Sequence, residues 1–124
     1  MNFTMKDLTI TIYEENVDEV INSHLECGLE DFEDKEFVRK QIEQELDKPC
    51  GMDFINLMSN YSKYTYRKLS VKGLTNRQVV EKILVFYKHK TFRRCMGNHT
   101  FLEGWFVFVE DWNDGEWVAC GYGS

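Results

Sequence analysis

The chain contains very little proline and has no long hydrophobic run. A single Pro and eight Gly among 124 residues exclude low-complexity, collagen-like and disordered classes. The longest uninterrupted apolar stretch is the five residues from Trp105 to Val109, and a membrane span needs about 20. The first residues, MNFTMKDLTI, lack a basic region followed by an apolar run. We therefore expect an intracellular protein with neither a secretory signal nor a membrane span.

The cysteines do not form a metal-binding pattern. Cys27, Cys50, Cys95 and Cys120 include no C-x-x-C pair, and no His stands at zinc-finger spacing from them. We expect reduced thiols that serve as small hydrophobic side chains. The sequence predicts no metal site and no cofactor.

Basic residues are absent from the last 30 residues of the chain, and charge is segregated elsewhere too. Residues 1–62 hold 15 acids and 5 bases, residues 63–94 hold 10 bases and the single acid Glu81, and residues 95–124 hold 5 acids. A basic block of this kind can present a face to an anionic partner. Alternatively, in a compact domain the acidic and basic segments lie against one another and neutralise. The sequence alone leaves both interpretations open.

Large rings are abundant, with 9 Phe, 6 Tyr and 3 Trp. A chain of 124 residues, 43% hydrophobic and 29% charged, fits a single folded domain over residues 1–124. A domain of this size buries about two-thirds of its unfolded surface, so some rings are expected outside, where Trp and Tyr often anchor interfaces. The alternative is a core unusually rich in rings.

The first half of the chain predicts one strand and three helices. Leu8, Ile10 and Ile12 alternate with polar residues, as in a half-buried strand over residues 7–13. Apolar spacing indicates a helix over 15–27, with Val17, Val20, Ile21, His24 and Leu25 on its inner stripe. Asp34 is a candidate cap for a second helix that ends near Asp47, with Phe37, Val38, Ile42 and Leu46 inward. After Pro49 a short third helix over 53–60 would bury Phe54, Ile55, Leu57 and Met58.

The second half predicts a strand, a helix and a hairpin. Residues 62–71 are rich in Tyr, Thr and Val and read as a strand with a basic outer side. Thr75 and Gln78 form a T-x-x-Q capping box, so a helix begins there and buries Val79, Val80, Ile83, Leu84 and Tyr87. A hairpin follows, with strands near 101–109 and 116–122. The predicted class is α+β, a mainly antiparallel sheet packed with about four helices in the order β-α-α-α-β-α-β-β.

The C-terminal half resembles a small domain found in proteins of giant DNA viruses of amoebae, of the marseillevirus and mimivirus type. The similarity lies in Gly73 to Val79, Phe86-Tyr87, Met96 to His99 with Phe101, Glu103 and Gly104, and the terminal Gly123-Ser124. The family pattern reads GLTxRxV, then FY, then GDHxFFEG, then GS. This chain has Asn98 and Leu102 where that pattern has Asp and Phe. The resemblance covers residues 70–124 and implies a viral protein of the infected cell's cytoplasm or nucleus, or of the virion; it implies no particular activity.

A basic band is the main alternative functional feature. It interleaves cations with Tyr64, Tyr66 and Tyr87, a combination that can bind phosphates and stack bases. Residues 88–94 also fit a nuclear-import tract, or simply the solvated end of a helix. The band comprises Lys63, Arg67, Lys68, Lys72, Arg77, Lys82, Lys88, Lys90, Arg93 and Arg94.

Catalytic candidates are few. Cys95 follows two arginines, which favour a thiolate, and His99 lies nearby, but we interpret Cys95 as a buried and inert residue. We assign His99, Glu103 and Gly104 a structural role at the start of the hairpin. No catalytic residue is predicted, and an enzyme is the least favoured class.

The favoured hypothesis is therefore a non-enzymatic protein that binds a macromolecular partner, most simply another protein, with self-association as a further option. Trp112 and Trp117 flank a polar turn that cannot bury both rings, so they are the predicted contact residues. The alternative is a nucleic-acid-binding protein that uses the basic segment 63–94.

Overall fold

The computed structural model describes residues 3–11, 13–27, 34–60, 65–88, 101–102, 107–108, 117–119 and 122–123, the last four segments as backbone. Within these residues the chain forms three α-helices and seven strands, and the fold is α+β. The predicted class is thus confirmed at this level.

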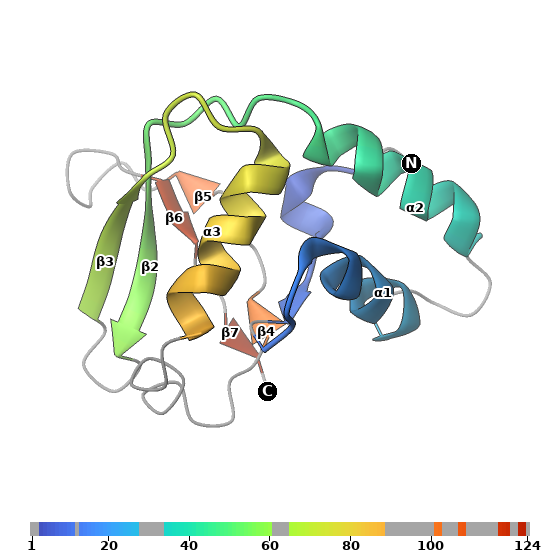
Figure 1. Cartoon of the computed structure of the whole chain (residues 1–124), viewed down its shortest axis with the longest axis horizontal. Helices are drawn as coiled ribbons and strands as arrows, with labels where there is room; N and C mark the ends of the chain where they lie inside the picture. The colour runs from blue at the N-terminus through green and yellow to red at the C-terminus, as the bar shows by residue number, and fades with distance from the viewer. Residues whose placement is uncertain are drawn as a thin grey trace.

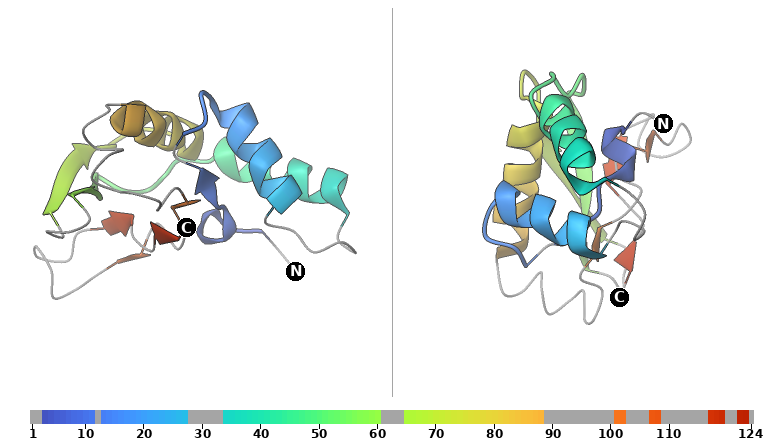
Figure 2. Two further views of the ribbon diagram at one scale, coloured as in Figure 1. Left: turned by 90° about the horizontal axis from the view of Figure 1, so that it is seen from below. Right: turned by 90° about the vertical axis from the view of Figure 1, so that its right-hand side faces the viewer.

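The helices lie together on one side of the molecule. They are α1 (Val17–Cys27), α2 (Lys35–Leu46) and α3 (Asn76–Lys88), and a 3-10 turn, η1 (Met5–Asp7), precedes them. Figure 2 shows the helices as one layer, with the orange and red C-terminal strands on the opposite side. In Figure 1 α3 lies between the β2–β3 pair and the other two helices. The central helix therefore contacts both halves of the fold.

The described strands form two small sheets. One has the order β1-β4-β7, from β1 (Ile10–Thr11), β4 (Phe101–Leu102) and β7 (Tyr122–Gly123). The other has the order β3-β2-β6-β5, from β2 (Phe54–Asn60), β3 (Thr65–Ser70), β5 (Val107–Phe108) and β6 (Trp117–Ala119). Among these described strands β2 and β6 are the one parallel pair; the other pairs are antiparallel. The expectation of a mainly antiparallel arrangement holds for these segments.

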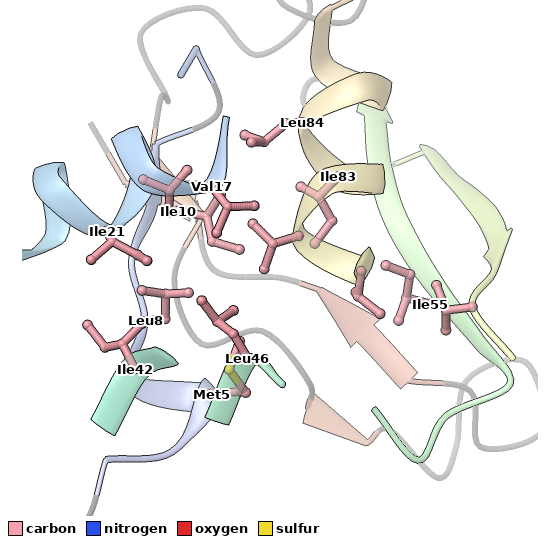
Figure 3. Close-up of a cluster of buried hydrophobic side chains, with 14 of the residues drawn as sticks. Met5, Leu8, Ile10, Val17, Ile21, Ile42, Leu46, Ile55, Ile83 and Leu84 are labelled. Atoms are coloured by element: carbon pink, nitrogen blue, oxygen red, sulfur yellow. The ribbon is translucent and has the colours of Figure 1, made fainter. Parts of the chain in front are cut away.

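One hydrophobic cluster joins the helices to the strands. Ile10 of β1, Ile21 of α1, Ile42 of α2, Ile55 of β2 and Ile83 of α3 are all completely buried in it. Figure 3 shows these side chains converging from elements far apart in the sequence. α1, α2, α3, η1, β1 and β2 each supply a buried side chain to this cluster, and Leu69 of β3 is partly buried against it. Helices of 11 to 13 residues are marginal in isolation, so this shared burial is what stabilises them.

The helix predicted over 53–60 is wrong, because that segment is strand β2. Its residues pair antiparallel with β3 and parallel with β6, for example Asn56 with Lys68 and with Val118. Ile55 and Leu57 are fully buried on one face, and Asn56 between them is 2% exposed. Short apolar runs have no periodicity that separates a buried strand from a helix. The order of elements is corrected accordingly: among the described residues two helices, not three, precede β2.

Three smaller expectations also change. Among the described residues the first strand covers Ile10–Thr11, because Asp7 belongs to η1 and Tyr13 to a turn, and Ile12 lies outside the described residues. Phe37, expected inward, is 56% exposed on α2. The strand expected near 101–109 contributes β4 to one sheet and β5 to the other, while the predicted hairpin pairing persists between β5 and β6. The turn between them lies outside the described residues.

The predicted caps of α2 and α3 and the predicted inner stripes of α1 and α3 are confirmed, while α1 begins at Val17 rather than at residue 15. Asp34 accepts hydrogen bonds from the backbone N–H groups of Glu36 and Phe37 and so caps α2. Thr75 and Gln78 form the capping box of α3, with N–H···O distances of 2.9 and 3.3 Å. The inner stripes of α1 and α3 are buried as expected: Val17, Val20, Ile21, His24 and Leu25, and Val79, Val80, Ile83, Leu84 and Tyr87.

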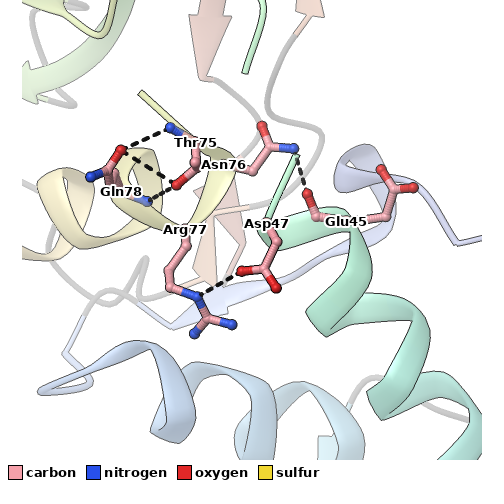
Figure 4. A network of polar contacts seen from close by, with 6 residues as sticks. All are labelled: Glu45, Asp47, Thr75, Asn76, Arg77 and Gln78. Carbon is pink, nitrogen blue, oxygen red and sulfur yellow. Dashed lines mark hydrogen bonds and ion pairs between the residues drawn. The ribbon is translucent and has the colours of Figure 1, made fainter. Parts of the chain in front are cut away.

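A polar junction fixes the start of α3 against the end of α2 (Figure 4). The Asn76 side-chain amide donates to the Glu45 carbonyl at 2.7 Å, and the Asn76 N–H donates to the Lys48 carbonyl at 2.9 Å. Arg77 Nε lies 3.5 Å from Asp47 Oδ1. The last carbonyls of a helix have no partner within it, and here another helix supplies one. This junction sets the direction in which α3 runs past α1.

Candidate functional site

A surface groove lies between the N-terminal turn of α1 and one side of α3. Its volume is about 370 Å³. Its lining combines three apolar residues with charged and polar ones: Glu15, Asn16, Val17, Asp18, Arg77, Glu81, Leu84, Val85 and Lys88. We refer to this feature as the α1–α3 groove.

Capping hydrogen bonds shape the α1 side of the groove. Asn16 Oδ1 accepts from the Glu19 N–H at 2.9 Å, and the Glu19 carboxylate accepts from the Glu15 N–H at 3.0 Å. These bonds satisfy backbone donors that an α-helix leaves open at its start. They fix the first turn of α1, where Val17 is buried and Asp18 is exposed to solvent.

The α3 side of the groove is a single stripe of the helix. Arg77, Glu81, Val85 and Lys88 follow one another at spacings of four, four and three residues, which places them on one face. Leu84 beside them is buried, whereas Val85 is 65% exposed. Val85 is thus an apolar side chain presented to solvent between two charged ones.

The two basic residues of the groove already have acidic neighbours. Lys88 Nζ lies 3.6 Å from Glu15 Oε2, and Arg77 pairs with Asp47 at 3.5 Å. Asp18 and Glu81 make no ion pair or side-chain hydrogen bond with any residue that the structure describes. Among the described residues, the charged side chains of the groove that make no ion pair are therefore both negative.

The predicted basic band divides into two parts. On α3, Arg77 and Lys88 pair with acids of the N-terminal segment, as the neutralisation interpretation predicts, and Lys82 donates to the Ser70 carbonyl at 2.6 Å. On and after β3, Arg67, Lys68 and Lys72 are exposed.

An exposed ring accompanies the cations of β3. Phe54 is 41% exposed, and the Lys68 ammonium lies 4.3 Å from the centre of its ring. Together with Phe54, the exposed cations on and after β3 form a small cationic and aromatic corner. Lys63, Lys90, Arg93 and Arg94 lie outside the described residues.

The predicted contact residues fall in the C-terminal segments. Trp117 belongs to β6, where it stands opposite Ile55 of β2 and Phe108 of β5, and the description is of its backbone. Trp112 lies outside the described residues, as do His99, Glu103 and Gly104. The structure therefore does not test the predicted contact surface or the predicted structural motif.

The buried histidine and the described thiol have packing roles. His24 Nδ1 accepts from the Thr9 N–H at 3.2 Å, and its ring stands edge to face with Phe3 at 5.9 Å. Cys50 is a free thiol, and its sulfur lies 3.4 Å from the Val71 carbonyl oxygen. Within the described part of the chain no group of three or more His, Cys, Asp or Glu could hold a metal ion.

Sequence reasoning did not identify the groove, although two signals were present. Glu81 is the single acid of the basic segment 63–94, and Val85 lies off the buried stripe of its helix. Neither feature is unusual by itself. The packing of α1 beside α3 places both residues in the lining of the α1–α3 groove.

Comparisons with protein-family models, with curated proteins and with solved structures find no match to this chain. Among the described residues, no helix has the length and apolar character that crossing a membrane requires.

Proposed function

We propose that this chain is a non-enzymatic protein that binds a protein partner, and that the α1–α3 groove takes part in the contact. The observation that carries the proposal is the 65% exposed Val85 inside a groove with charged rims. A contact centre of apolar atoms within a polar border is the usual anatomy of protein interfaces.

The packing of α3 makes the exposure of Val85 informative. The neighbouring apolar residues Val80, Ile83 and Leu84 are at most 2% exposed. The core-facing stripe of α3 is therefore already buried, and Val85 lies outside it. Single exposed apolar residues are common on protein surfaces. Val85 differs because it lines a groove together with Leu84 and Val17, so an incoming side chain would meet more than one apolar residue.

Photo-crosslinking from position 85 tests the proposal. Val85 is replaced by a photoreactive phenylalanine analogue, the full chain is expressed in cells and irradiated, and crosslinked products are identified with and without nuclease treatment. Glu36, exposed on α2 outside the groove, is the matched control position. The expected result is a nuclease-resistant protein adduct from position 85 that is absent from position 36. The same adducts from both positions, or none from position 85, would contradict the proposal.

The proposed contact surface also includes Trp112 and Trp117, on the grounds of their ring type and their position around a polar turn. Truncation of a Trp anchor typically costs about 2 kcal/mol or more of binding. Capture of the partner crosslinked from position 85 should therefore weaken in Trp112→Ala and in Trp117→Ala. If neither change alters capture or self-association, the hairpin is not part of the surface.

A second candidate function is nucleic-acid binding, and the exposed corner of Phe54, Arg67, Lys68 and Lys72 favours it. Two described cations of the band, Arg77 and Lys88, are paired with acids, which makes those two less available to phosphates. Each phosphate neutralised on duplex DNA contributes a slope of about −0.9 in log affinity against log salt. Titration of DNA and RNA oligonucleotides at two salt concentrations decides between the functions: no binding at low salt, or binding insensitive to salt, removes this candidate.

The proposal includes a viral setting, with the protein acting inside the infected cell or in the virion. This part rests on the resemblance of residues 70–124 to a domain of amoebal giant viruses. Detection of the protein by mass spectrometry in purified particles and in infected-cell fractions would test it.

A further inference from the structure

We infer that the segment bound in the α1–α3 groove is basic and apolar, with a Lys or Arg head between Asp18 and Glu81 and its aliphatic stem over Val85. This inference rests on the proposed function and adds the chemistry of the partner.

The charge pattern of the groove supports a basic occupant. Its two cations are engaged, Lys88 with Glu15 at 3.6 Å and Arg77 with Asp47 at 3.5 Å. Its exposed carboxylates Asp18 and Glu81 make no such contact among the described residues. An acidic segment would meet two like charges here, whereas a basic one would complement both.

The position of Glu81 within its helix separates this pattern from ordinary helix electrostatics. Asp18 is in the first turn of α1, where a carboxylate also interacts favourably with the helix dipole. Glu81 is in the middle of α3, beyond the reach of either helix end. Arg77 precedes Glu81 by four residues on the same face, but its guanidinium lies 3.5 Å from Asp47 Oδ1, and no ion pair joins it to Glu81 among the described residues.

The spacing on α3 suits a long amphipathic side chain. Glu81 and Val85 are four residues apart, so their Cβ atoms are separated by about 5–6 Å. A Lys or Arg side chain has an apolar stem of comparable length, which can lie on apolar surface while its charged head group stays in a polar environment. One such side chain can therefore cover Val85 and reach the Glu81 carboxylate, in a groove that Leu84 and Val17 also line.

A second copy of the chain is a poorer occupant. A second copy would offer its own exposed cations, which in the described residues include Lys35 and Lys40 of α2, Lys48, Lys68 and Lys72, and these belong to a chain with 21 acids and 15 bases. The net charge of −6 also opposes the approach of two copies. We therefore assign the groove to a different protein.

Peptide binding tests the inference without knowledge of the natural partner. The probe is a fluorescent peptide of four Gly-Lys-Leu repeats, and its counterpart carries Glu in place of Lys. Binding to the full chain is measured by fluorescence anisotropy at low salt, and the site is mapped by amide chemical shifts. We expect the Lys peptide to bind, with shifts at residues 15–18 and 81–88, and the Glu peptide not to bind.

Two double variants separate the effect of the groove carboxylates on peptide binding from the effect of the overall negative charge of the chain. Asp18→Asn with Glu81→Gln should weaken binding of the Lys peptide by about fivefold, the loss expected from two exposed ion pairs. Glu26→Gln with Glu43→Gln removes the same charge from exposed positions on α1 and α2 outside the groove and should leave affinity nearly unchanged. Val85→Ser should also weaken binding, and unchanged melting temperatures establish that each variant is folded.

Three results would overturn the inference: equal weakening in both double variants, equal binding of the two peptides, or amide shifts away from the groove. A crosslink from position 85 to a second copy of the chain would also overturn it. If position 85 captures a different protein but the Asp18 and Glu81 variants leave that capture intact, the inference fails while the proposed function stands. If position 85 captures nothing, the proposed function fails first.

Discussion

At the scale of single residues, the buried polar groups show how the fold is fixed. Asn76 is 5% exposed, and its amide donates to the Glu45 carbonyl. His24 is equally buried and accepts the Thr9 N–H. Both side chains satisfy backbone groups of another element, because a buried polar group without a partner costs free energy. They specify which elements lie side by side.

Removal of the Asn76 amide should destabilise the protein. In Asn76→Ala the Glu45 carbonyl keeps the Lys48 N–H at 3.2 Å but loses the shorter bond from Asn76. We expect the free energy of unfolding to fall by about 1–2 kcal/mol, measured by urea denaturation. Gln44→Ala, truncation of a side-chain amide at an exposed position of α2, should cost less than about 0.5 kcal/mol. Equal losses in the two variants would show that the α2–α3 junction contributes nothing specific.

At the scale of elements, β2 is the segment in which sequence pattern and structure differ. Phe54, Ile55, Leu57 and Met58 suit an amphipathic helix, yet the segment pairs with β3 on one side and β6 on the other. Strand β3 follows β2 in the chain, whereas β6 is distant in sequence. Residues 53–60 alone therefore do not show that either strand is available for pairing. Hydrogen bonding to both neighbours and burial of Ile55 and Leu57 favour the strand.

Truncation of two residues distinguishes the strand from the expected helix. Leu57→Ala should lower the free energy of unfolding by about 2–5 kcal/mol, because Leu57 is fully buried. Phe54→Ala should cost about 1 kcal/mol, since the ring is 41% exposed and its contact with Lys68 is at the surface. If the segment were a helix with Phe54 facing inward, Phe54→Ala would lower the free energy of unfolding by about 3–5 kcal/mol. Chemical denaturation of the two variants separates these outcomes.

The start of α3 depends on a local signal that the sequence contains in full. In Gln78→Ala the Thr75 N–H loses its acceptor at 2.9 Å, and we expect a loss of about 0.3–1.5 kcal/mol in the free energy of unfolding. Gln44→Ala on α2 is the matched control, because Gln44 is exposed and Ala is the better helix former. Thermal and urea unfolding measure both. A control that loses as much as Gln78→Ala would argue against a role for the capping box.

At the scale of the whole molecule, folding brings part of the basic segment against the acidic N-terminal segment within the described residues. The pairs Lys88–Glu15 and Arg77–Asp47 join the basic segment to the acidic one. All four side chains are partly or largely exposed, so the pairs add little stability. Their larger effect is on the surface, where they occupy the cations of the α1–α3 groove and leave a negative site beside an exposed valine.

The chain should unfold as one cooperative unit, in line with the prediction of a single domain over residues 1–124. All three Trp belong to the last 20 residues, so Trp fluorescence reports the C-terminal region, while far-UV circular dichroism reports α1, α2 and α3. Because β6 pairs with β2 and β4 pairs with β1, the two signals should share one midpoint in urea. A fluorescence transition clearly earlier than the loss of helix would contradict this expectation and divide the chain into two units.

The sequence by itself determined the features that depend on neighbouring residues. The cap at Asp34, the capping box at Thr75 and the buried stripes of α1 and α3 are all readable within a few turns of chain. The α+β class follows from the mixture of such segments. These features are local because helix spacing and end capping involve residues at most four positions apart.

The tertiary structure decided the features that depend on residues distant in the chain. The strand state of β2 requires β6 about 60 positions away, and the division of the C-terminal strands between two sheets requires β1 at the other end. The same holds for the α1–α3 groove, in which Asp18 and Glu81 share one site only because Asn76 and the hydrophobic core set the course of α3. Hydrophobic burial is non-directional, so a local pattern shows that a side chain is buried but not which segment covers it.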